Sequence, residues 1–452
     1  MELQFLGATD SVTGSKYMLD TGRSRVMVDC GLFQGFKSLR LRNWDPLPVD
    51  PATLDAVILT HAHIDHSGYL PLLVRNGFRG SVFCTMGTAQ LCGILLPDSA
   101  ALAEEDAEYA NRKRFSRHRP ALPLYTSADA GRALRRLEPK PFGTRFSLTH
   151  DIEAEFHHAG HIIGAAAVTL HAGGQRIVFS GDLGRQNDIV MRPPEFIREA
   201  DCLLVESTYG NRIHPDEDPL DAVAGVVGST LGRGGTLVIP AFAVGRTQAL
   251  LYCLHRLLEE RRMPDIPIYL NSPMAIDATQ IFALHPDELR IDRAACAAAC
   301  GLPIPVQSVE QSVWLNQDHA PKIILAGSGM ATGGRVVHHL AAFGRDPRCT
   351  ILLSGFQAPG TRGAALASGQ RELRIHGKDV AIHAAVEQIH GLSAHADANE
   401  LMTWLNGFQA PPRRIFIVHG EPDASDAMRQ RVERGLGWQV TMPEYRKTYR
   451  LD

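Results

Sequence analysis

Long apolar runs and secretion signals are missing from this sequence of 452 residues. No stretch approaches the roughly 20 apolar residues that a membrane-spanning helix needs, so we expect no membrane partner. The first residues, Met1–Phe5, carry neither the charged segment nor the apolar core of a signal peptide. Together these absences predict a cytoplasmic protein.

Paired cysteine motifs are missing as well, because the eight cysteines are scattered and none form a C-x-x-C pair. In a chain of this length, that distribution favours reduced thiols over a disulfide framework. An excess of positive charge is also absent, since 46 Lys and Arg residues against 49 Asp and Glu residues leave a net charge of −3. This balance argues against a protein that coats DNA non-specifically, although it allows an enzyme with a local basic surface.

One basic run stands out from this balance, at residues 112–119 (RKRFSRHR). It holds five Lys or Arg side chains, one histidine and no acid. A solvated loop explains this run as well as a nucleic-acid contact does, and the sequence leaves both interpretations open.

Short β-like runs separated by glycine and polar turns fill most of the chain up to residue 206. Helices fit Leu70–Asn76 and a longer stretch from Thr88 to about Asn111. Many strands with helices between the groups predict two stacked sheets flanked by helices.

The pattern changes after Tyr209, where apolar strands such as Thr236–Ala241 and Thr350–Phe356 alternate with helices. Continuously apolar strands of this kind predict a parallel sheet that is covered on both faces. The tail returns to the first style, and we expect its strands Val380–Ile389 and Ile415–Val418 to rejoin the first domain. The predicted organisation is a first domain made of residues 1–208 and 386–452, with residues 209–385 inserted into it.

A histidine-rich motif, HAHIDH at residues 61–66, follows the apolar run Ala56–Thr60 directly. Imidazole and carboxylate are ligands that zinc and manganese accept. Residues two apart on a turn can point to one side, so His61 and His63 are candidates for one ion, and Asp65 and His66 for a neighbouring ion. The alternative is a surface loop that happens to be rich in histidine, which the position after a buried strand disfavours.

Two ions need more ligands, and three further segments supply them. His161 lies in a turn between two expected strands, whereas Asp182 and His419 each follow an apolar strand. One such residue alone is weak evidence, because a lone histidine is usually structural. Together they place acid and imidazole groups at the ends of separate strands, which is typical of a metal site at the edge of a sheet.

These residues resemble a known family. The run at 61–66, with Asp29 upstream and His161 and Asp182 downstream, is similar to the metal-ligand pattern of the metallo-β-lactamase superfamily. Further segments resemble motifs of its β-CASP nucleases, namely Glu206–Gly210 (ESTYG), Pro240–Arg246 (PAFAVGR), Gly327–Met330 (GSGM), Ser393–Asp397 (SAHAD) and Val418–Glu421 (VHGE). The resemblance covers essentially the whole chain. It implies an α/β fold, an αββα metallo-β-lactamase sandwich with an inserted β-CASP domain that contains a mainly parallel α/β sheet.

The resemblance also implies a role for each residue. By this carry-over, His61, His63 and His161 hold one metal ion, Asp65, His66 and His419 hold the other, and Asp182 bridges them. Asp29 resembles the acid that supports the histidine loop from behind. His395 resembles the histidine that contacts the scissile phosphate and protonates the leaving oxygen, and Glu206 resembles the acid that orients it. Asp65, Asp182, Glu206 and His395 are the expected catalytic residues.

The function that the resemblance implies is RNA processing or decay. Members of the DNA-repair branch typically lack the last histidine, whereas His419 is present here and the acid of the first additional motif is Glu206. We expect a ribonuclease with two Zn²⁺ ions, with Mn²⁺ as the alternative metal, acting on single-stranded RNA. Two ions can activate a water for in-line attack on phosphorus, which leaves a 5′-phosphate and a 3′-hydroxyl. Endonuclease and 5′-exonuclease action both stay open, and so does a homodimer.

The inserted domain has to hold the polymer. Ser328 and Arg335 lie in a glycine-rich loop after a strand and before a helix, where backbone N–H groups can cradle a phosphate. Arg246 opens another helix after a strand, and Tyr209 is a weaker candidate for contact with the substrate. A tight turn that needs positive φ is the alternative for the glycines of this loop.

Three rival functions remain at this point. A small-molecule hydrolase shares the motif at 61–66 but does not need the insertion, His395 or His419. A DNA nuclease of the same fold is disfavoured by His419. A catalytically inactive RNA-binding scaffold would have lost metal ligands, and every expected ligand is present here.

Overall fold

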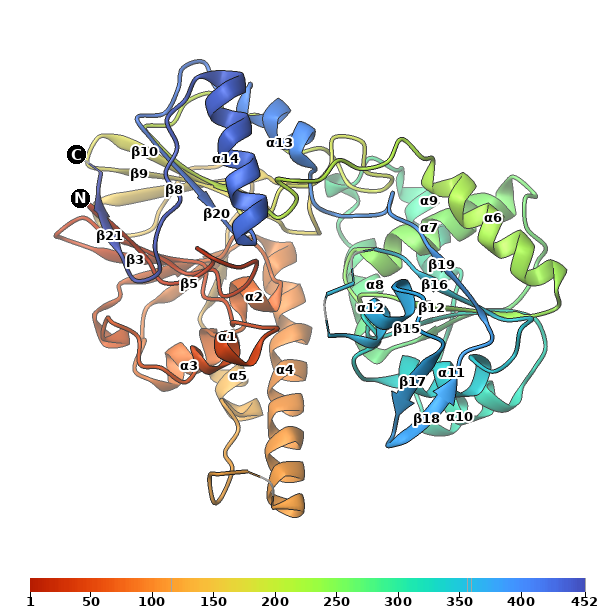
Figure 1. Ribbon diagram of the computed structural model, residues 1–452. Helices are drawn as coiled ribbons and strands as arrows, with labels where there is room; N and C mark the ends of the chain where they lie inside the picture. Colours follow the sequence, from red (N-terminus) through yellow and green to blue (C-terminus); the bar gives the residue numbers. More distant parts are fainter. Residues whose placement is uncertain (115, 356, 359, 452) are drawn as a thin grey trace. The chain divides into compact units, whose positions relative to one another are not determined.

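The computed structural model describes residues 1–114, 116–355, 357–358 and 360–451 (Figure 1). Phe115 of the basic run and Phe356 of one expected strand lie outside them. The chain divides into two compact units. The first unit comprises Met1–Gln186, Arg192–Ile213 and His395–Asp452, and the second comprises Asn187–Met191 and His214–Ala394.

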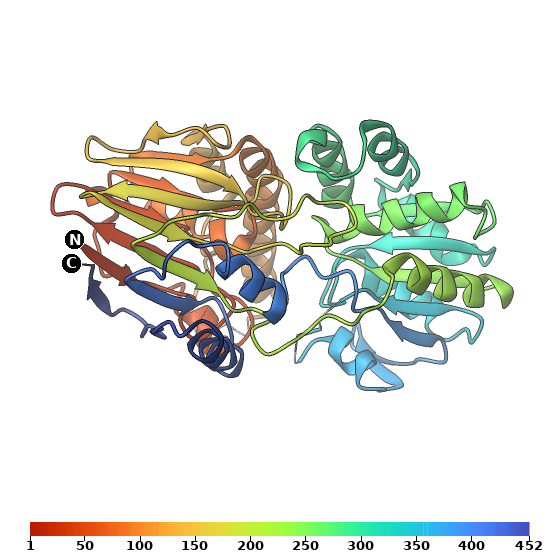
Figure 2. The ribbon, with the colours of Figure 1, turned by 90° about the horizontal axis from the view of Figure 1, so that it is seen from above.

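The first unit is built on two sheets that lie face to face (Figures 1 and 2). The seven-stranded sheet runs in the order β21 (Thr448–Arg450), β1 (Glu2–Phe5), β2 (Tyr17–Asp20), β3 (Arg25–Val28), β4 (Ala56–Ile58), β5 (Ser81–Cys84) and β6 (Leu137–Pro139). The six-stranded sheet runs β20 (Arg414–Val418), β11 (Cys202–Glu206), β10 (Gln175–Phe179), β9 (Ala166–Ala172), β8 (Ile152–His158) and β7 (Phe146–Ser147).

Helices cover the outer side of each sheet (Figure 1). Those on the side of the first sheet are α1 (Lys37–Leu41), α2 (Ile64–Ser67), α3 (Leu70–Arg75), α4 (Met86–Lys113) and α5 (Ser127–Leu134), with the short 3-10 helix η1 (Pro51–Thr53) nearby in sequence. On the side of the second sheet are α13 (Ala398–Leu405) and α14 (Pro422–Leu436). The prediction of two stacked sheets flanked by helices is confirmed.

Side chains that alternate between buried and exposed positions give each sheet an inner face that packs in the core. Along β8, Ile152, Ala154 and Phe156 are buried, whereas Glu153 is exposed, the period-two pattern of a strand with one face in the core. Strand β11 lies in parallel between β10 and β20, and all five of its residues are buried. One hydrophobic core therefore joins side chains from both sheets.

The second unit is organised around a parallel sheet. Its order is β14 (Ile304–Pro305), β13 (Ile268–Asn271), β15 (Lys322–Ala326), β12 (Thr236–Pro240), β16 (Thr350–Leu353) and β19 (Ala385–Gln388). The helices of this unit are α6 (Pro219–Gly232), α7 (Arg246–Glu259), α8 (Pro273–Ala283), α9 (Arg293–Gly301), α10 (Val309–Gln317), α11 (Arg335–Phe343), α12 (Arg362–Ala367) and the 3-10 helix η2 (Pro286–Glu288). Every residue of β12 and β15 is buried, so the predicted parallel sheet with two covered faces is confirmed.

The tail of the insertion differs from the sequence prediction. The expected strand Val380–Ile389 is two strands, β18 (Lys378–Ala381) and β19, and neither rejoins the first unit. Strand β18 forms a hairpin with β17 (Glu372–Ile375), and β19 pairs in parallel with β16. The chain re-enters the first unit at His395 rather than at residue 386, because β19 completes the edge of the second unit's sheet.

All eight cysteines are free thiols. Within the described part of the chain, no helix combines the length and apolar character needed to cross a bilayer.

The two ends of the chain meet in the core of the first unit. Strand β21 pairs antiparallel with β1, and the rings of Phe5, Phe416 and Tyr449 pack together, with Phe416 centred 4.9 Å from Phe5 and 5.1 Å from Tyr449. Aromatic packing of this kind adds to the free energy gained from burial. The C-terminal segment is therefore part of the same core as the first strand.

We predict that Phe416→Ala lowers the free energy of unfolding of the first unit by about 3–5 kcal/mol, because it leaves a cavity in this aromatic cluster. The change can be measured by urea denaturation followed by tryptophan fluorescence. Leu41→Ala is the matched control, since Leu41 is 53% exposed, and surface substitutions usually stay within about 0.5 kcal/mol. Equal effects of the two substitutions would contradict the prediction.

Candidate metal centre

The carboxyl ends of three neighbouring strands define one side of the site. Strands β10, β11 and β20 run in parallel, so the residues that follow them meet at the same edge of the sheet. Glu206 ends β11, Asp182 follows β10 within three residues, and His419 follows β20 directly. Parallel pairing of these strands thus brings two acids and an imidazole together from distant parts of the chain.

The facing sheet supplies the histidine motif. Residues 61–66 follow β4, and α2 begins at Ile64. Backbone hydrogen bonds tie this turn to the segment after β3, since Cys30 N donates to His66 O and Leu32 N donates to Ile64 O. Between them, Gly31 is required by space, because a Cβ there would lie 1.6 Å from Asp65 O.

One cluster consists of His61, His63, His161 and Asp182, whose ligand atoms all lie within 4.8 Å of one another. His63 Nδ1 lies 3.1 Å from His61 Nε2 and 3.2 Å from His161 Nε2. Four ligands at about 2.0–2.1 Å from one tetrahedral ion lie about 3.3 Å apart. The spacing of these nitrogens therefore fits a single divalent ion.

A second cluster consists of Asp65, His66 and His419. His419 Nε2 lies 3.0 Å from His66 Nε2 and 3.5 Å from Asp65 Oδ2. On its other side, His419 Nδ1 is 3.1 Å from Thr208 Oγ1. This cluster has the same ligand chemistry and spacing as the first.

The two carboxylate oxygens of Asp182 face different histidine clusters. Oδ2 lies 3.4 Å from His61 Nε2 and 3.7 Å from His161 Nε2. Oδ1 lies 3.3 Å from His66 Nε2 and 3.4 Å from His419 Nδ1. Oδ1 is buried and makes no hydrogen bond within the described residues. A buried carboxylate oxygen without a donor is costly unless a cation satisfies it, so the site fits divalent metal.

Asp29 supports the motif from behind. Its carboxylate accepts hydrogen bonds from Thr60 N at 2.7 Å and Thr60 Oγ1 at 2.9 Å, and it lies 2.7 Å from His66 Nδ1. Because His66 Nδ1 faces this acid, its Nε2 faces the second cluster. Thr60 Oγ1 is also 3.1 Å from His61 Nδ1, which turns His61 Nε2 toward the first cluster in the same way.

The electrostatics of the clusters suit a bound cation. Burial lowers the pKa of His61 well below its usual value, with His66 adding to the effect, and burial likewise lowers the pKa of His63. Both rings are therefore neutral, the form that binds metal. Burial also disfavours the charged form of His66, but Asp182 and Asp29 outweigh it and raise its pKa well above the usual value. The acids around His66 thus favour positive charge at this point.

His395 lies beside the clusters and next to Glu206. Its Nδ1 is 3.5 Å from Glu206 Oε2, and its ring is centred 4.4 Å from that of His161. Burial lowers the pKa of His395, but the charge and hydrogen bonding of Glu206 outweigh it, and the pKa is raised to about 8. The side chain of His395 is 22% exposed, whereas that of Glu206 is fully buried, so His395 offers an acid–base group at the accessible side of the clusters.

The four expected substrate contacts fall in different units. Tyr209 is in the first unit, with its ring 5.8 Å from that of His395 and the guanidinium of Arg212 5.4 Å above it. Arg246, Ser328 and Arg335 belong to the second unit. Arg246 opens α7, with its guanidinium packed closely over Gly355.

Ser328 and Arg335 make many contacts within their own unit. Ser328 Oγ accepts hydrogen bonds from Thr332 N at 3.1 Å and Gly333 N at 3.4 Å. The guanidinium of Arg335 donates to protein oxygens of Asn271 at 2.8 Å, Val306 at 2.7 Å and Gln307 at 2.6 Å. These bonds occupy three of the five N–H donors of the Arg335 guanidinium.

The sequence alone does not identify two supporting residues, Thr60 and Thr208. Thr60 directly precedes His61, and Thr208 is two positions after Glu206. The one sequence feature that could have pointed to them is a hydroxyl side chain close to the end of a buried strand. Which ring nitrogen each hydroxyl would meet depends on the fold, so the sequence could not supply it.

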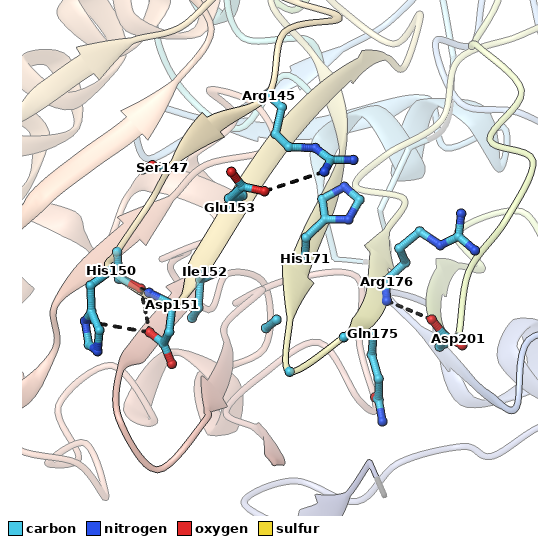
Figure 3. Close-up of a pocket in the computed structure, with 14 residues that line it drawn as sticks. Arg145, Ser147, His150, Asp151, Ile152, Glu153, His171, Gln175, Arg176 and Asp201 are labelled. Atoms are coloured by element: carbon cyan, nitrogen blue, oxygen red, sulfur yellow. Dashed lines mark hydrogen bonds and ion pairs between the residues drawn. The ribbon is translucent and has the colours of Figure 1, made fainter.

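A separate polar groove lies at the other end of β9 and β10, around their connecting turn (Figure 3). Its volume is about 720 Å³, and it contains none of the predicted site residues. Arg145 pairs with Glu153 at 3.5 Å, and Asp201 accepts a hydrogen bond from Arg176 N at 2.8 Å. Because several of its charges already have partners, we assign this groove no ligand.

Three regions of the chain match known families. Residues 12–82 match the metallo-β-lactamase superfamily, residues 247–366 match the β-CASP domain, and residues 379–443 match the Zn-dependent metallo-hydrolase RNA specificity domain. These regions contain the motif at 61–66, the core of the second unit, and both His395 and His419.

Individual relatives align over almost the whole chain. Ribonuclease TTHA0252 of Thermus thermophilus is 36% identical over 434 residues, covering 94% of each chain. Transcription termination factor FttA of Methanosarcina mazei is 33% identical, covering 93% of this chain and 67% of that protein. The RNase J-like protein of Methanocaldococcus jannaschii is 28% identical, covering 93% and 92%.

A solved structure supports the fold alone. The crystal structure of a protein of unknown function from Enterococcus faecalis V583 matches with a TM-score of 0.54 at 13% identity, covering 99% of both chains.

We predict that Asp29→Asn weakens retention of divalent metal by about 10–100-fold, because His66, an expected ligand, loses the acid that orients it. The measurement is metal content after dialysis against a competing chelator. Asp265→Asn, at an exposed position of the second unit, is the control and should leave metal content unchanged. Full metal retention by Asp29→Asn would contradict the role of this contact.

Proposed function

The chain belongs to the β-CASP family of the metallo-β-lactamase superfamily and is a metal-dependent nuclease, and from this premise we propose that it is a zinc-dependent ribonuclease. It hydrolyses RNA phosphodiester bonds with two metal ions and leaves 5′-phosphate and 3′-hydroxyl ends. The observation that carries the two-metal part is the position of Asp182, whose two carboxylate oxygens face different histidine clusters.

Each cluster would hold one Zn²⁺ ion, with Mn²⁺ as the alternative metal. In this proposal His61, His63 and His161 would hold the first ion, Asp65, His66 and His419 would hold the second, and Asp182 would be shared by both. Bound ions supply the activation of a water for in-line attack on phosphorus. The expected ligands are shielded from bulk solvent, since His61, His66, His161, Asp182 and His419 are all buried.

His395 would deliver the proton to the departing sugar oxygen. Glu206 supports this role because its carboxylate faces His395 Nδ1. The other ring nitrogen of His395, Nε2, therefore points away from Glu206. Glu206 is held in turn by Leu183 N, which donates to its Oε1 at 2.5 Å. A general acid with a fixed orientation contributes about 10²–10⁴-fold to rate.

RNA is favoured as the substrate by the comparisons. The match to an RNA specificity domain spans residues 379–443, and two of the relatives carry names that refer to ribonuclease activity. The second unit, with its own sheet, argues against a small-molecule hydrolase, and the complete ligand set argues against an inactive scaffold. A DNA nuclease of the same fold is the remaining candidate.

For substrate contact we propose Tyr209, Arg246 and Ser328. Tyr209 is favoured by its ring contact with His395. Arg335 also remains proposed, although three of its five N–H donors bond to Asn271, Val306 and Gln307. In this proposal those bonds hold the loop in front of α11 in place, and the other two donors are offered to a phosphate.

We predict that His395→Ala lowers kcat for RNA cleavage by about 10²–10⁴-fold while metal content stays at that of the unaltered protein, because His395 is not a ligand in this proposal. Glu206→Gln should lower kcat less, since it removes only the orienting charge. His390→Ala, at an exposed histidine five positions earlier, is the control. Unchanged cleavage by His395→Ala would overturn the proposed acid.

Asp182→Ala should lose metal as well as activity, because it removes the carboxylate whose oxygens face both clusters. Metal content can be measured by atomic emission on protein purified without chelator, where the unaltered chain should carry about two ions. If Asp182→Ala kept both ions, the bridging role would be wrong.

The substrate can be tested with matched single strands. End-labelled linear and circular RNA, and DNA of the same sequence, are incubated with the metal-loaded protein. We expect cleavage of RNA with 5′-phosphate products, and cleavage of circular RNA would establish endonuclease action. Resistance of all RNA together with cleavage of DNA would replace the proposed substrate by DNA.

A further inference from the structure

The described residues of the basic run, 112–114 and 116–119, lie at the far end of the longest helix of the described chain. Helix α4 comprises 28 residues, Met86–Lys113, and is followed by an irregular turn (Figure 1). We call the cations Arg112, Lys113, Arg114, Arg117 and Arg119 the arm tip. All five are exposed.

The other end of α4 is anchored beside the metal centre. Thr85 Oγ1 and Thr88 Oγ1 donate hydrogen bonds to Gly164 O at 2.6 Å and 2.9 Å, and Gly164 is in the same turn as His161. A 28-residue helix is about 42 Å long at a rise of 1.5 Å per residue. The arm tip is therefore held about 40 Å from the turn that carries a predicted metal ligand.

The N-terminal half of α4 is packed against the protein, whereas its C-terminal half is largely exposed to solvent. Leu91, Leu95 and Leu96 are buried in the first half of α4, whereas most residues after Ala100 are exposed or half-buried. At the end, the side chain of Asn111 closes the turn by donating to Ala121 O at 2.9 Å and accepting from Ala121 N at 2.7 Å. The turn that carries the charges is thus tied back onto the helix.

The charges of the arm tip are not neutralised by acids of the described residues. No ion pair joins any of its five cations to an acid within the described ranges. The acids of α4, such as Glu105 and Glu108, precede the tip along the helix. Clustered like charges repel one another, so their concentration in a chain of net charge −3 favours an external polyanion.

An aromatic ring accompanies these cations. Tyr109 is 48% exposed, one turn before the tip, and the guanidinium of Arg112 lies 5.6 Å from its ring centroid. Exposed aromatic rings beside Lys and Arg side chains are the combination that binds single-stranded nucleic acid without reading its sequence.

We propose that the arm tip is a second, sequence-independent contact for the phosphate backbone of the RNA substrate. This inference rests on the proposed ribonuclease function and adds to it a dependence on substrate length. An RNA long enough to occupy the metal centre and the arm tip together gains affinity from both contacts, as in other bivalent binding. A small phosphodiester gains nothing from the arm.

The test uses the full-length protein with Arg112→Gln, Lys113→Gln and Arg117→Gln combined. We expect the Kd for a single-stranded RNA of about 40 nucleotides to rise about tenfold at low salt. The slope of log affinity against log salt concentration should fall by up to about 2, at about 0.7 per lost phosphate contact. Hydrolysis of bis(4-nitrophenyl) phosphate, which cannot reach the arm, should be unchanged and also reports that the variant is folded.

A matched control combines Arg23→Gln, Lys378→Gln and Arg413→Gln, three exposed cations outside the arm. It removes the same net charge and should leave the affinity for RNA within about twofold, since isolated surface charges act weakly through screening. Equal loss of affinity in both variants would mean that net charge, and not the arm tip, is responsible, and would overturn the inference.

The outcomes separate the inference from the proposed function. If the unaltered protein cleaves and binds RNA but the arm variant has the same Kd and salt slope, the arm tip has another partner and the inference is wrong. If the unaltered protein neither binds nor cleaves RNA, the proposed function fails and the inference fails with it. Loss of affinity for long RNA alone supports the arm as an RNA contact.

Discussion

The carboxylate of Asp182 is the group on which the arrangement of the site depends. It is buried, and its two oxygens lie 3.3–3.7 Å from imidazole nitrogens of both histidine clusters. A buried charge requires partners of opposite sign, and here a metal ion on each side would provide them. The clusters are thereby coupled, since neither can be altered without changing the electrostatic surroundings of the other.

The positions of these proposed ligands come from the ends of strands in the two sheets. Parallel pairing of β10, β11 and β20 aligns the ends that carry Asp182, Glu206 and His419. From the facing sheet, Asp29 and Thr60 hold the rings of His61 and His66 in one orientation. A site supported by strand ends and buried hydrogen bonds keeps its geometry before a ligand arrives, which lowers the reorganisation needed for catalysis.

The second unit shows where local patterns mislead. Val380–Ile389 is apolar enough for a strand of either domain, and only the pairing of β19 with β16 assigns it to the second unit. For Arg335, the glycine-rich loop before it does not reveal that its guanidinium also bonds to oxygens of Asn271, Val306 and Gln307. A side chain's partners depend on residues far away in the sequence, which a motif does not contain.

The sequence by itself determined the fold class, the family and the chemical types of the ligands. These are local properties, because an apolar strand followed by His, Asp or Glu can be recognised without knowing its neighbours. Only the tertiary structure decided how the ligands divide, with Asp182 between two clusters, and which hydroxyls, Thr60 and Thr208, orient the rings. It also gave the basic run at 112–119 a place about 40 Å along α4 from the His161 turn. The reason is physical: distances and partners arise when segments hundreds of residues apart pack together, and periodicity within one segment carries no record of that packing.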